Sequence, residues 1–184
     1  QTMAEQNKET FEQYNFKKIV TQCPHCFTTL KNDYAEMGIE LDVVHHSQFI
    51  DELINEKKIE PKPYVDEDIT FHDPCYLGRH NGEYDAPRKV LQSVLKEGRI
   101  KEMEQSKSDS FCCGAGGGNM WYEIKTGERI NQNRVNQAVG TEAKTIAAAC
   151  NFCNIMLEDG VKTTGNEENI KVIDIAEMVS KSLG

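Results

Sequence analysis

Short apolar runs recur along the chain and are separated by longer amphipathic stretches. Runs of this kind, without strict alternation of polar and apolar residues, are typical of strands buried on both faces of a sheet. Strands that alternate with helical patterns predict an α/β layered fold with a mostly parallel sheet. The expected strands are Ile19–Val20, Val43–Val44, Ile69–Phe71, Ile146–Ala149 and Val172–Ile173.

Three amphipathic stretches predict helices. The first runs from Met3 to Tyr14, and the third from about Gly127 to Gly140. In the second, Asp85 is a good N-cap and Pro87 lies in the first turn, two features that favour the start of a helix. The buried side of this second helix is predicted by an apolar stripe made of Val90, Leu91, Val94 and Leu95.

Two segments of the chain resemble each other. Residues 18–30 and 145–157 each combine an apolar run, a Cys-x-x-Cys motif and an amphipathic stretch, followed about 20 residues later by a second apolar pair and a helix. A repeat in fixed order indicates a duplicated structural unit. We therefore expect duplicated Rossmann-like units with mostly parallel sheets flanked by helices. The charged stretch Asn55–Asp68, which contains Pro61 and Pro63, is expected to link the two copies.

Composition narrows the class of protein. The chain has 184 residues and a net charge of −9, which argues against nucleic acid as a partner. No apolar run approaches the roughly 18 residues of a membrane span, so we expect no membrane contact by this segment. Seven cysteines, an odd number that includes an adjacent pair, argue against a disulfide scaffold. They favour thiolates bound to metal in a reducing compartment.

Five of the cysteines form one pattern: Cys75, the pair Cys112 and Cys113, and the pair Cys150 and Cys153. Thirty-six residues separate Cys75 from the adjacent pair, and thirty-six separate that pair from Cys150. Soft thiolates gathered from three segments are a means of holding an iron–sulfur cluster or zinc. The pattern therefore predicts a metal centre with electron-transfer or redox chemistry.

The predicted fold brings distant cysteines together. Cys23, Cys75, Cys112 and Cys150 are each expected just after a strand, and ligands gather at the carboxyl ends of the strands in parallel sheets. An adjacent pair of cysteines can reach different metals of a cluster, whereas it serves a single tetrahedral ion poorly. The glycine-rich stretch Gly114–Gly118 lets backbone N–H groups approach the sulfur atoms.

Whole motifs of the chain match a known family. The cysteine pattern, together with the segments 23–26 (CPHC), 72–79 (HDPCYLGR) and 111–121 (FCCGAGGGNMW), covers nearly the whole chain. These motifs resemble the cysteine-rich CCG domain of heterodisulfide reductase catalytic subunits and related iron–sulfur oxidoreductases, including those encoded near electron-transfer flavoproteins. In that family the full protein carries two CCG motifs, usually after a ferredoxin-like domain and sometimes a membrane anchor.

The resemblance implies an enzyme, an iron–sulfur oxidoreductase of the heterodisulfide reductase type. In heterodisulfide reductase, each motif holds a non-cubane [4Fe–4S] cluster through five cysteines. The ligands implied here are Cys75, Cys112, Cys113, Cys150 and Cys153.

The resemblance also implies a domain organisation. Residues 1–62 would be the C-terminal part of a truncated first CCG unit, and residues 63–184 a complete second unit. Residues 1–184 alone are expected to be inactive. The implied partners are an electron-transfer flavoprotein, a ferredoxin-like domain or a quinone-linked protein. The implied location is cytoplasmic, with membrane association through a part upstream of Gln1.

The remaining Cys-x-x-Cys motif has several interpretations. Cys23 and Cys26 match the tail of the first CCG motif and would form a second half-site. They could also act as a redox dithiol, or bind zinc together with His25, His45 or His46.

Two further side chains flank the site. His72 is a candidate catalytic residue that donates protons near a cluster-bound sulfur, or a structural residue beside a turn that Asp73 and Pro74 shape. Arg79 either neutralises the charge of the cluster or pairs with a surface carboxylate.

Two functions of other classes stay open. The first is a zinc-binding or metal-free scaffold domain that docks partners. The second is a thiol–disulfide enzyme that uses Cys23 and Cys26, whose activity would be lost in Cys26→Ser and unaffected in Cys75→Ser.

Overall fold

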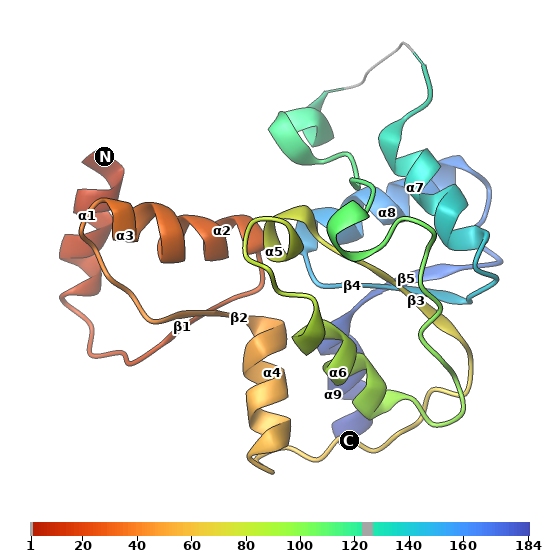
Figure 1. Ribbon diagram of the computed structural model, residues 1–184, viewed down its shortest axis with the longest axis horizontal. Coiled ribbons are helices and arrows are strands. Elements are labelled where there is room, and N and C mark those ends of the chain that lie inside the picture. The colour runs from red at the N-terminus through yellow and green to blue at the C-terminus, as the bar shows by residue number, and fades with distance from the viewer. Residues whose placement is uncertain (1, 123–126) are drawn as a thin grey trace.

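The computed structural model describes residues 2–122 and 127–184, which form a layered α/β structure (Figure 1). The strands are β1 (Ile19–Thr21), β2 (Val43–His45), β3 (Ile69–His72), β4 (Thr145–Ala148) and β5 (Lys171–Asp174). The longer helices are α1 (Thr2–Phe11), α4 (His46–Asn55), α6 (Asp85–Val94), α7 (Ile130–Val139), α8 (Asn151–Thr163) and α9 (Ile175–Leu183). The shorter ones are α2 (Pro24–Thr28), η1 (Thr29–Asp33), α3 (Tyr34–Glu36), α5 (Cys75–Gly78), η2 (Lys107–Asp109) and η3 (Gly116–Trp121).

A three-stranded parallel sheet lies at the centre of the larger part of the molecule. Its strand order is β3–β4–β5, with Phe71 opposite Ala147 and Ala147 opposite Ile173. In Figure 1, α7 and α8 lie on one side of this sheet, and α6 and α9 lie on the other. Ala147 packs into the core with α6 and α9, whereas its neighbour Ile146 packs with α7 and α8. Because both faces are covered, every residue of β4 is buried, which explains its run of apolar residues.

The smaller sheet consists of β1 and β2, which also run parallel, with Ile19 opposite Val43. Among the described residues, no strand pairs with the other edge of β1, and Val20 is 44% exposed. The parallel pairing in both sheets and the flanking helices confirm the predicted fold class.

The two copies of the repeat share one strand register. Thr21 pairs with His45 in the first copy, and Ala148 pairs with Asp174 in the second. Thr21 and Ala148 each precede the first cysteine of a Cys-x-x-Cys motif by two residues. In each copy, the Cys-x-x-Cys motif therefore lies beside the start of the helix that follows the neighbouring strand, α4 in the first copy and α9 in the second.

The two copies also share their helix starts and lengths. His45 caps α4 by accepting a hydrogen bond from the backbone N–H of Ser47, and Asp174 caps α9 by accepting from Ala176. The continuous helical stretch 24–36 has the same length as α8, 13 residues. Equal register, caps and helix length confirm that the unit is duplicated.

The start of the helix predicted from Asp85 differs in one detail. Asp85 is the first helical residue and Tyr84 is the N-cap, so the prediction that Asp85 caps this helix is wrong. The Glu83 carboxylate accepts hydrogen bonds from the backbone N–H groups of Asp85 (3.1 Å) and Ala86 (2.9 Å). Because Glu83 already satisfies these two donors, the Asp85 side chain is not needed as a cap.

Other boundaries shift by a few residues. Helix α1 ends at Phe11, and α7 begins at Ile130. Leu95 lies beyond the end of α6 in extended conformation and forms a parallel bridge with Val65, inside the stretch predicted as a linker. The linker therefore contributes to the core as well as connecting the two copies.

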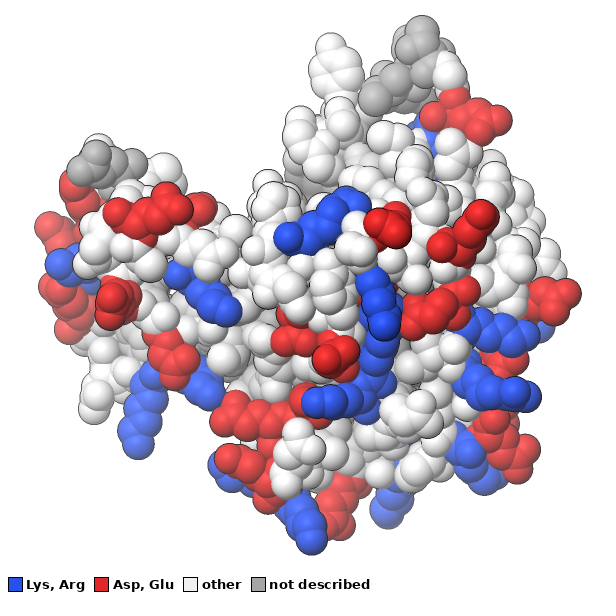
Figure 2. All heavy atoms as spheres, in the orientation of Figure 1, with Lys and Arg blue, Asp and Glu red and all other residues white. Residues whose placement is uncertain are grey.

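The surface is polar and carries charges of both signs. Figure 2 shows Lys and Arg side chains interspersed with Asp and Glu over the face that is drawn. No helix among residues 2–122 and 127–184 is long and apolar enough to cross a membrane.

Stability is expected to fall at acid pH through His45. Burial, and next the charge of His46, lowers the pKa of His45 to about 3. The unfolded chain takes up this proton below its ordinary pKa of about 6.5, so stability is unaffected above that pH and is lost between about 6.5 and 3. Between pH 7 and pH 5, the free energy of unfolding in urea should fall by about 2 kcal/mol more for the wild type than for His45→Asn. Asparagine keeps the N-cap, and equal losses in both proteins would contradict the assignment.

Candidate metal centre

The five cysteines of the pattern lie around one small pocket. Cys75 opens α5 directly after β3, Cys150 is the N-cap of α8, and Cys153 lies in the first turn of α8. Cys112 and Cys113 come from the coil that follows η2. All five line the pocket. Its other lining residues include Pro24, His25, Pro74, Tyr76 and Phe152.

The prediction that Cys112 directly follows a strand is wrong, because residues 110–113 are coil. Side chains hold this segment in place of a sheet ladder. The Ser110 hydroxyl donates to the Asp73 carbonyl oxygen at 3.1 Å, and Arg79 Nη1 donates to the Ser110 carbonyl oxygen at 2.7 Å. These contacts tie the coil to the segment that follows β3.

Neighbouring thiols shift one another's pKa values, which links the cysteines in the order Cys75, Cys112, Cys113, Cys153 and Cys150. The thiols of Cys113 and Cys75 both stabilise the Cys112 thiolate, so its pKa lies far below the ordinary value despite burial. By the same contact, the pKa of Cys113 is raised to about 12. Five thiols in one connected group, with one strongly stabilised thiolate, fit the donor set of an iron–sulfur cluster.

A second thiolate is stabilised at the start of α8. The pKa of Cys150 is lowered to about 5, first by the Cys153 thiol and then by the His25 ring, which lines the same pocket. The backbone N–H groups of Cys153 and Phe152, at the N-terminus of the helix, act in the same direction. His25 belongs to the first copy of the repeat, so the two copies meet at this cysteine.

Backbone N–H groups approach the sulfur of the adjacent pair. The N–H of Gly114 donates to Cys112 Sγ at 3.2 Å. Gly114 has a φ of +93°, which L side chains rarely adopt, and a Cβ there would lie 3.2 Å from the Cβ of Ile130. Glycine at this position therefore allows both the turn and the close approach of the backbone to sulfur.

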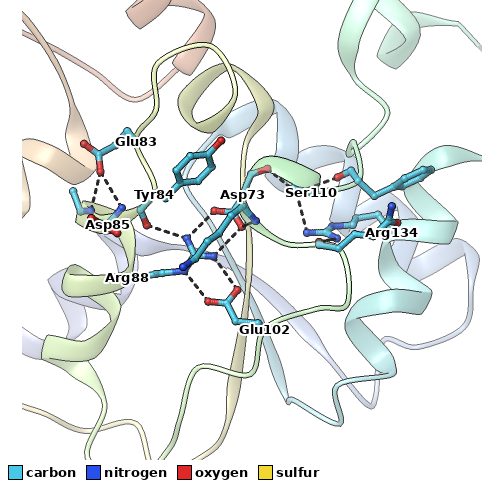
Figure 3. Close-up of polar contacts among 12 residues, drawn as sticks. Asp73, Glu83, Tyr84, Asp85, Arg88, Glu102, Ser110 and Arg134 are labelled. Carbon is cyan, nitrogen blue, oxygen red and sulfur yellow. Dashed lines mark hydrogen bonds and ion pairs between the residues drawn. The ribbon is translucent and has the colours of Figure 1, made fainter.

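Asp73 and Arg88 fix the segment that carries Cys75 (Figure 3). The Arg88 guanidinium donates to both carboxylate oxygens of Asp73, at 2.8 and 2.9 Å, and to both of Glu102, at 2.7 and 2.8 Å. Its remaining N–H donates to the Tyr84 carbonyl oxygen at 2.9 Å. Asp73 is 3% exposed, so this fork satisfies a buried carboxylate.

His72 is fully buried beside the cysteines. A ring nitrogen of His72 and the sulfur atoms of Cys113 and Cys153 lie within 4.8 Å of one another. Arg134, from α7, donates to His72 Nδ1 at 2.9 Å. It also donates to the Ser110 hydroxyl at 3.2 Å, and Figure 3 shows these two residues side by side. Burial and the charge of Arg134 hold the pKa of His72 well below its ordinary value. His72 is thus neutral at physiological pH.

Cys23 and Cys26 lie apart from the five. Neither lines the pocket, although the intervening Pro24 and His25 do. Burial, above all, raises the pKa of Cys23 to about 11, which disfavours the nucleophilic thiolate that a thiol–disulfide enzyme needs.

The structure gives little support to zinc at this motif. The two ring nitrogens of His45 contact the Ser47 hydroxyl (2.8 Å) and the Gln22 carbonyl oxygen (3.1 Å). In the described part of the chain, no histidine forms a close group of three ligand atoms with Cys23 and Cys26.

Arg79 lies on the site rather than on a surface carboxylate. No ion pair joins Arg79 to a carboxylate within the described ranges. Cys112 and then burial raise the pKa of Cys75, and the charge of Arg79 opposes that shift. Of the two roles weighed for Arg79, the structure supports neutralisation of the site.

The chain matches the family model described as "CCG: Cysteine-rich domain" over residues 1–31 and 69–158. It is 43% identical over 190 residues to the "EtfAB:quinone oxidoreductase" of Syntrophomonas wolfei and 42% identical over 183 residues to the "Probable iron-sulfur-binding oxidoreductase FadF" of Bacillus subtilis. Both alignments cover 100% of this chain and 26% of the relative. This chain therefore corresponds to about a quarter of each of these relatives.

A third relative is one of the subunits of the dihydromethanophenazine:CoB–CoM heterodisulfide reductase of Methanosarcina barkeri. It is 37% identical over 185 residues, covering 99% of this chain and 44% of the relative. The resemblance inferred from the cysteine motifs is thereby confirmed. The chain belongs to the CCG cysteine-rich domain family, and it is related to iron–sulfur oxidoreductases of the heterodisulfide reductase type.

Proposed function

We propose that this chain is the cluster-binding part of an iron–sulfur oxidoreductase. Cys75, Cys112, Cys113, Cys150 and Cys153 would hold one [4Fe–4S] cluster, of the non-cubane kind found in heterodisulfide reductase. The observation that carries the proposal is the convergence of five thiols from three segments on one pocket.

The electrostatics of the site support this ligand set. Cys112 and Cys150 have lowered pKa values, and thiolates rather than thiols bind metals. The cationic Arg79 and Arg134 offset the negative charge of several thiolates. The N–H of Gly114 already donates to sulfur, which is how protein groups tune such a centre.

When bound, the cluster would supply one-electron chemistry. The chain's own residues would ligate it, keep it within a largely buried pocket, and donate hydrogen bonds to its sulfur atoms. We further propose that residues 1–62 belong to a first CCG unit and residues 63–184 to a second. Cys23 and Cys26 would then be the tail of another ligand set, which residues 1–184 alone do not complete.

Electron partners are proposed from the names of the relatives. Those names refer to an EtfAB:quinone oxidoreductase and, for a further relative from Chromohalobacter salexigens that is 42% identical over 188 residues, to a "Probable membrane-anchored ferredoxin". We propose that electrons pass between this cluster and a flavoprotein, a ferredoxin-like domain or a quinone-linked protein, in the cytoplasm or at its membrane. Because the chain corresponds to only 26% of the EtfAB:quinone oxidoreductase and 44% of the heterodisulfide reductase subunit, we expect residues 1–184 alone to lack turnover.

The test is the content of iron, acid-labile sulfide and zinc per chain after anaerobic purification and reconstitution. We expect about four irons and four sulfides in the wild type. Cys112→Ser should lose most of both, because Cys112 is the thiolate that two neighbouring thiols stabilise.

Cys26→Ser is the matched control, since Cys26 is exposed and lies outside the pocket. It should retain the iron and sulfide of the wild type. Zinc in place of iron, or no metal in the wild type, would reject the cluster and favour a scaffold. Equal iron in wild type and Cys112→Ser would reject the ligand set.

A further inference from the structure

Arg134 is the largest side chain that is fully buried among the described residues. Its donors meet neutral acceptors: His72 Nδ1 at 2.9 Å, the Gln105 carbonyl oxygen at 2.8 Å, Gln137 Oε1 at 2.7 Å and the Ser110 hydroxyl at 3.2 Å. A buried cation needs compensating negative charge. Here that charge comes first from Asp73, and, once a metal holds Cys153 and Cys113 as thiolates, from these two sulfur atoms as well.

The contact between Arg134 and His72 decides which nitrogen of the imidazole carries hydrogen. A guanidinium only donates, so the His72 Nδ1 that it contacts must be an acceptor without hydrogen. In a neutral imidazole the hydrogen then sits on Nε2. A nitrogen that carries hydrogen has no lone pair to offer a metal, so Nε2 can only donate.

The position of His72 in the fold gives this N–H its acceptor. In β3, alternate residues face opposite sides of the sheet, so that Phe71 packs with α6 and α9 while His72 faces α7. On this side the ring lies within 4.8 Å of the sulfur atoms of Cys113 and Cys153. With Nδ1 occupied by Arg134, Nε2 is the nitrogen left to face sulfur.

We propose that Arg134 and His72 act as a positioning pair for the cluster, in which Arg134 fixes the Nε2–H form of His72 and this N–H donates to the thiolate of Cys113 or Cys153. The inference rests on the proposed cluster. His72 is then not a metal ligand. It donates a hydrogen bond through Nε2–H and does not transfer that proton as a catalytic acid. Hydrogen bonds to sulfur stabilise the more negative, reduced state, so the pair raises the reduction potential of the centre.

The tautomer is testable without any cluster. In ¹⁵N NMR of the metal-free protein with labelled histidine, His72 should show hydrogen on Nε2 and none on Nδ1. Arg134→Met should weaken this preference, because the donor to Nδ1 is lost. Hydrogen on Nδ1 in the wild type would overturn the proposal, whatever metal the protein binds.

The potential tests the second half of the proposal. His72→Gln keeps an acceptor for Arg134 and a donor for sulfur, whereas His72→Leu keeps neither. In EPR-monitored redox titrations of reconstituted protein, His72→Leu should have a more negative midpoint potential, and His72→Gln should stay near the wild type. Arg134→Met should also shift to a more negative potential, and it serves as the second variant if His72→Leu does not fold.

Several outcomes separate this inference from the proposed function. Iron and sulfide are measured first. If the wild type binds no cluster, the proposed function is rejected, and the tautomer of His72 alone then tests the pairing of Arg134 with His72. If His72→Leu or Arg134→Met kept its full iron content and the midpoint potential of the wild type, the proposed role of Arg134 and His72 would be overturned. Pulsed EPR should detect no nitrogen bound directly to iron in the wild type, and such a nitrogen would make His72 a ligand instead.

Discussion

Replacing Arg88 by methionine is expected to lower the free energy of unfolding by about 3–5 kcal/mol. Arg88 donates through all its N–H groups, to the Asp73 and Glu102 carboxylates and to the Tyr84 carbonyl oxygen. Methionine fills similar volume but leaves Asp73, which is 3% exposed, without its ion-pair partner and with the Lys107 backbone N–H as a donor. Removing one partner of a buried ion pair is costly because the other charge stays buried and uncompensated. Urea unfolding at neutral pH measures the loss.

Arg129→Met is the matched control. Arg129 pairs with Asp159 at 3.0 Å, but both side chains are about a third or more exposed, at 35% and 42%. Pairs of this kind contribute about 0–1 kcal/mol, so the control should unfold nearly as the wild type does. If both variants lost similar free energy of unfolding, the burial of Asp73 would not explain the cost of removing Arg88. Because Asp73 anchors the segment before Cys75, Arg88→Met should also reduce iron retention.

Gly160→Val is expected to destabilise the protein by about 3 kcal/mol. Gly160 lies in α8 where this helix packs on α7. A Cβ there would lie 2.8 Å from Val135 Cγ2 and 2.9 Å from the Asn131 carbonyl oxygen, and backbone cannot move aside as a side-chain tip can. The two helices would have to separate. Thermal unfolding followed by circular dichroism measures the effect.

The control for this variant is Gly140→Ala, at the C-terminal end of α7. A Cβ at Gly140 would meet no atom closer than 3.4 Å, which is ordinary contact. Its effect should stay below about 1 kcal/mol, and alanine's better helix propensity opposes any loss. If both variants unfolded alike, close packing of α7 on α8 would not explain the glycine at 160.

Sequence patterns predicted the strands and the repeat well because both depend on local order. Buried strands need apolar runs, and β4 is buried on both faces, so its pattern was clear. Element ends were less predictable, because long-range side chains decide them. Glu83 takes over the capping of α6, and Leu95 leaves the helix to pair with Val65.

At the site, the residues with chemical signatures were predictable and their supports were not. The five cysteines carried the signal of spacing and adjacency, and the structure brings them together. Arg88 gave no such signal, because its partners are fixed only when distant segments meet. Arg134 did leave a trace in the sequence, as a charged residue between the apolar Ile130 and Val135 on one helix. The sequence predicts His25 only as a zinc ligand, whereas its ring lines the pocket with Cys150 of the other copy and lowers the pKa of that cysteine.

The open edge of β1 affects how the molecule meets copies of itself. On one edge of residues 19–21, no described strand pairs with the backbone donors and acceptors. The middle residue of this strand, Val20, is apolar and exposed. Such an edge is a template for strand addition by another chain, and proteins usually protect it with charge, proline or a covering segment. In concentrated solution, addition of a strand from another copy at the edge of β1 is therefore the route by which residues 1–184 are expected to aggregate.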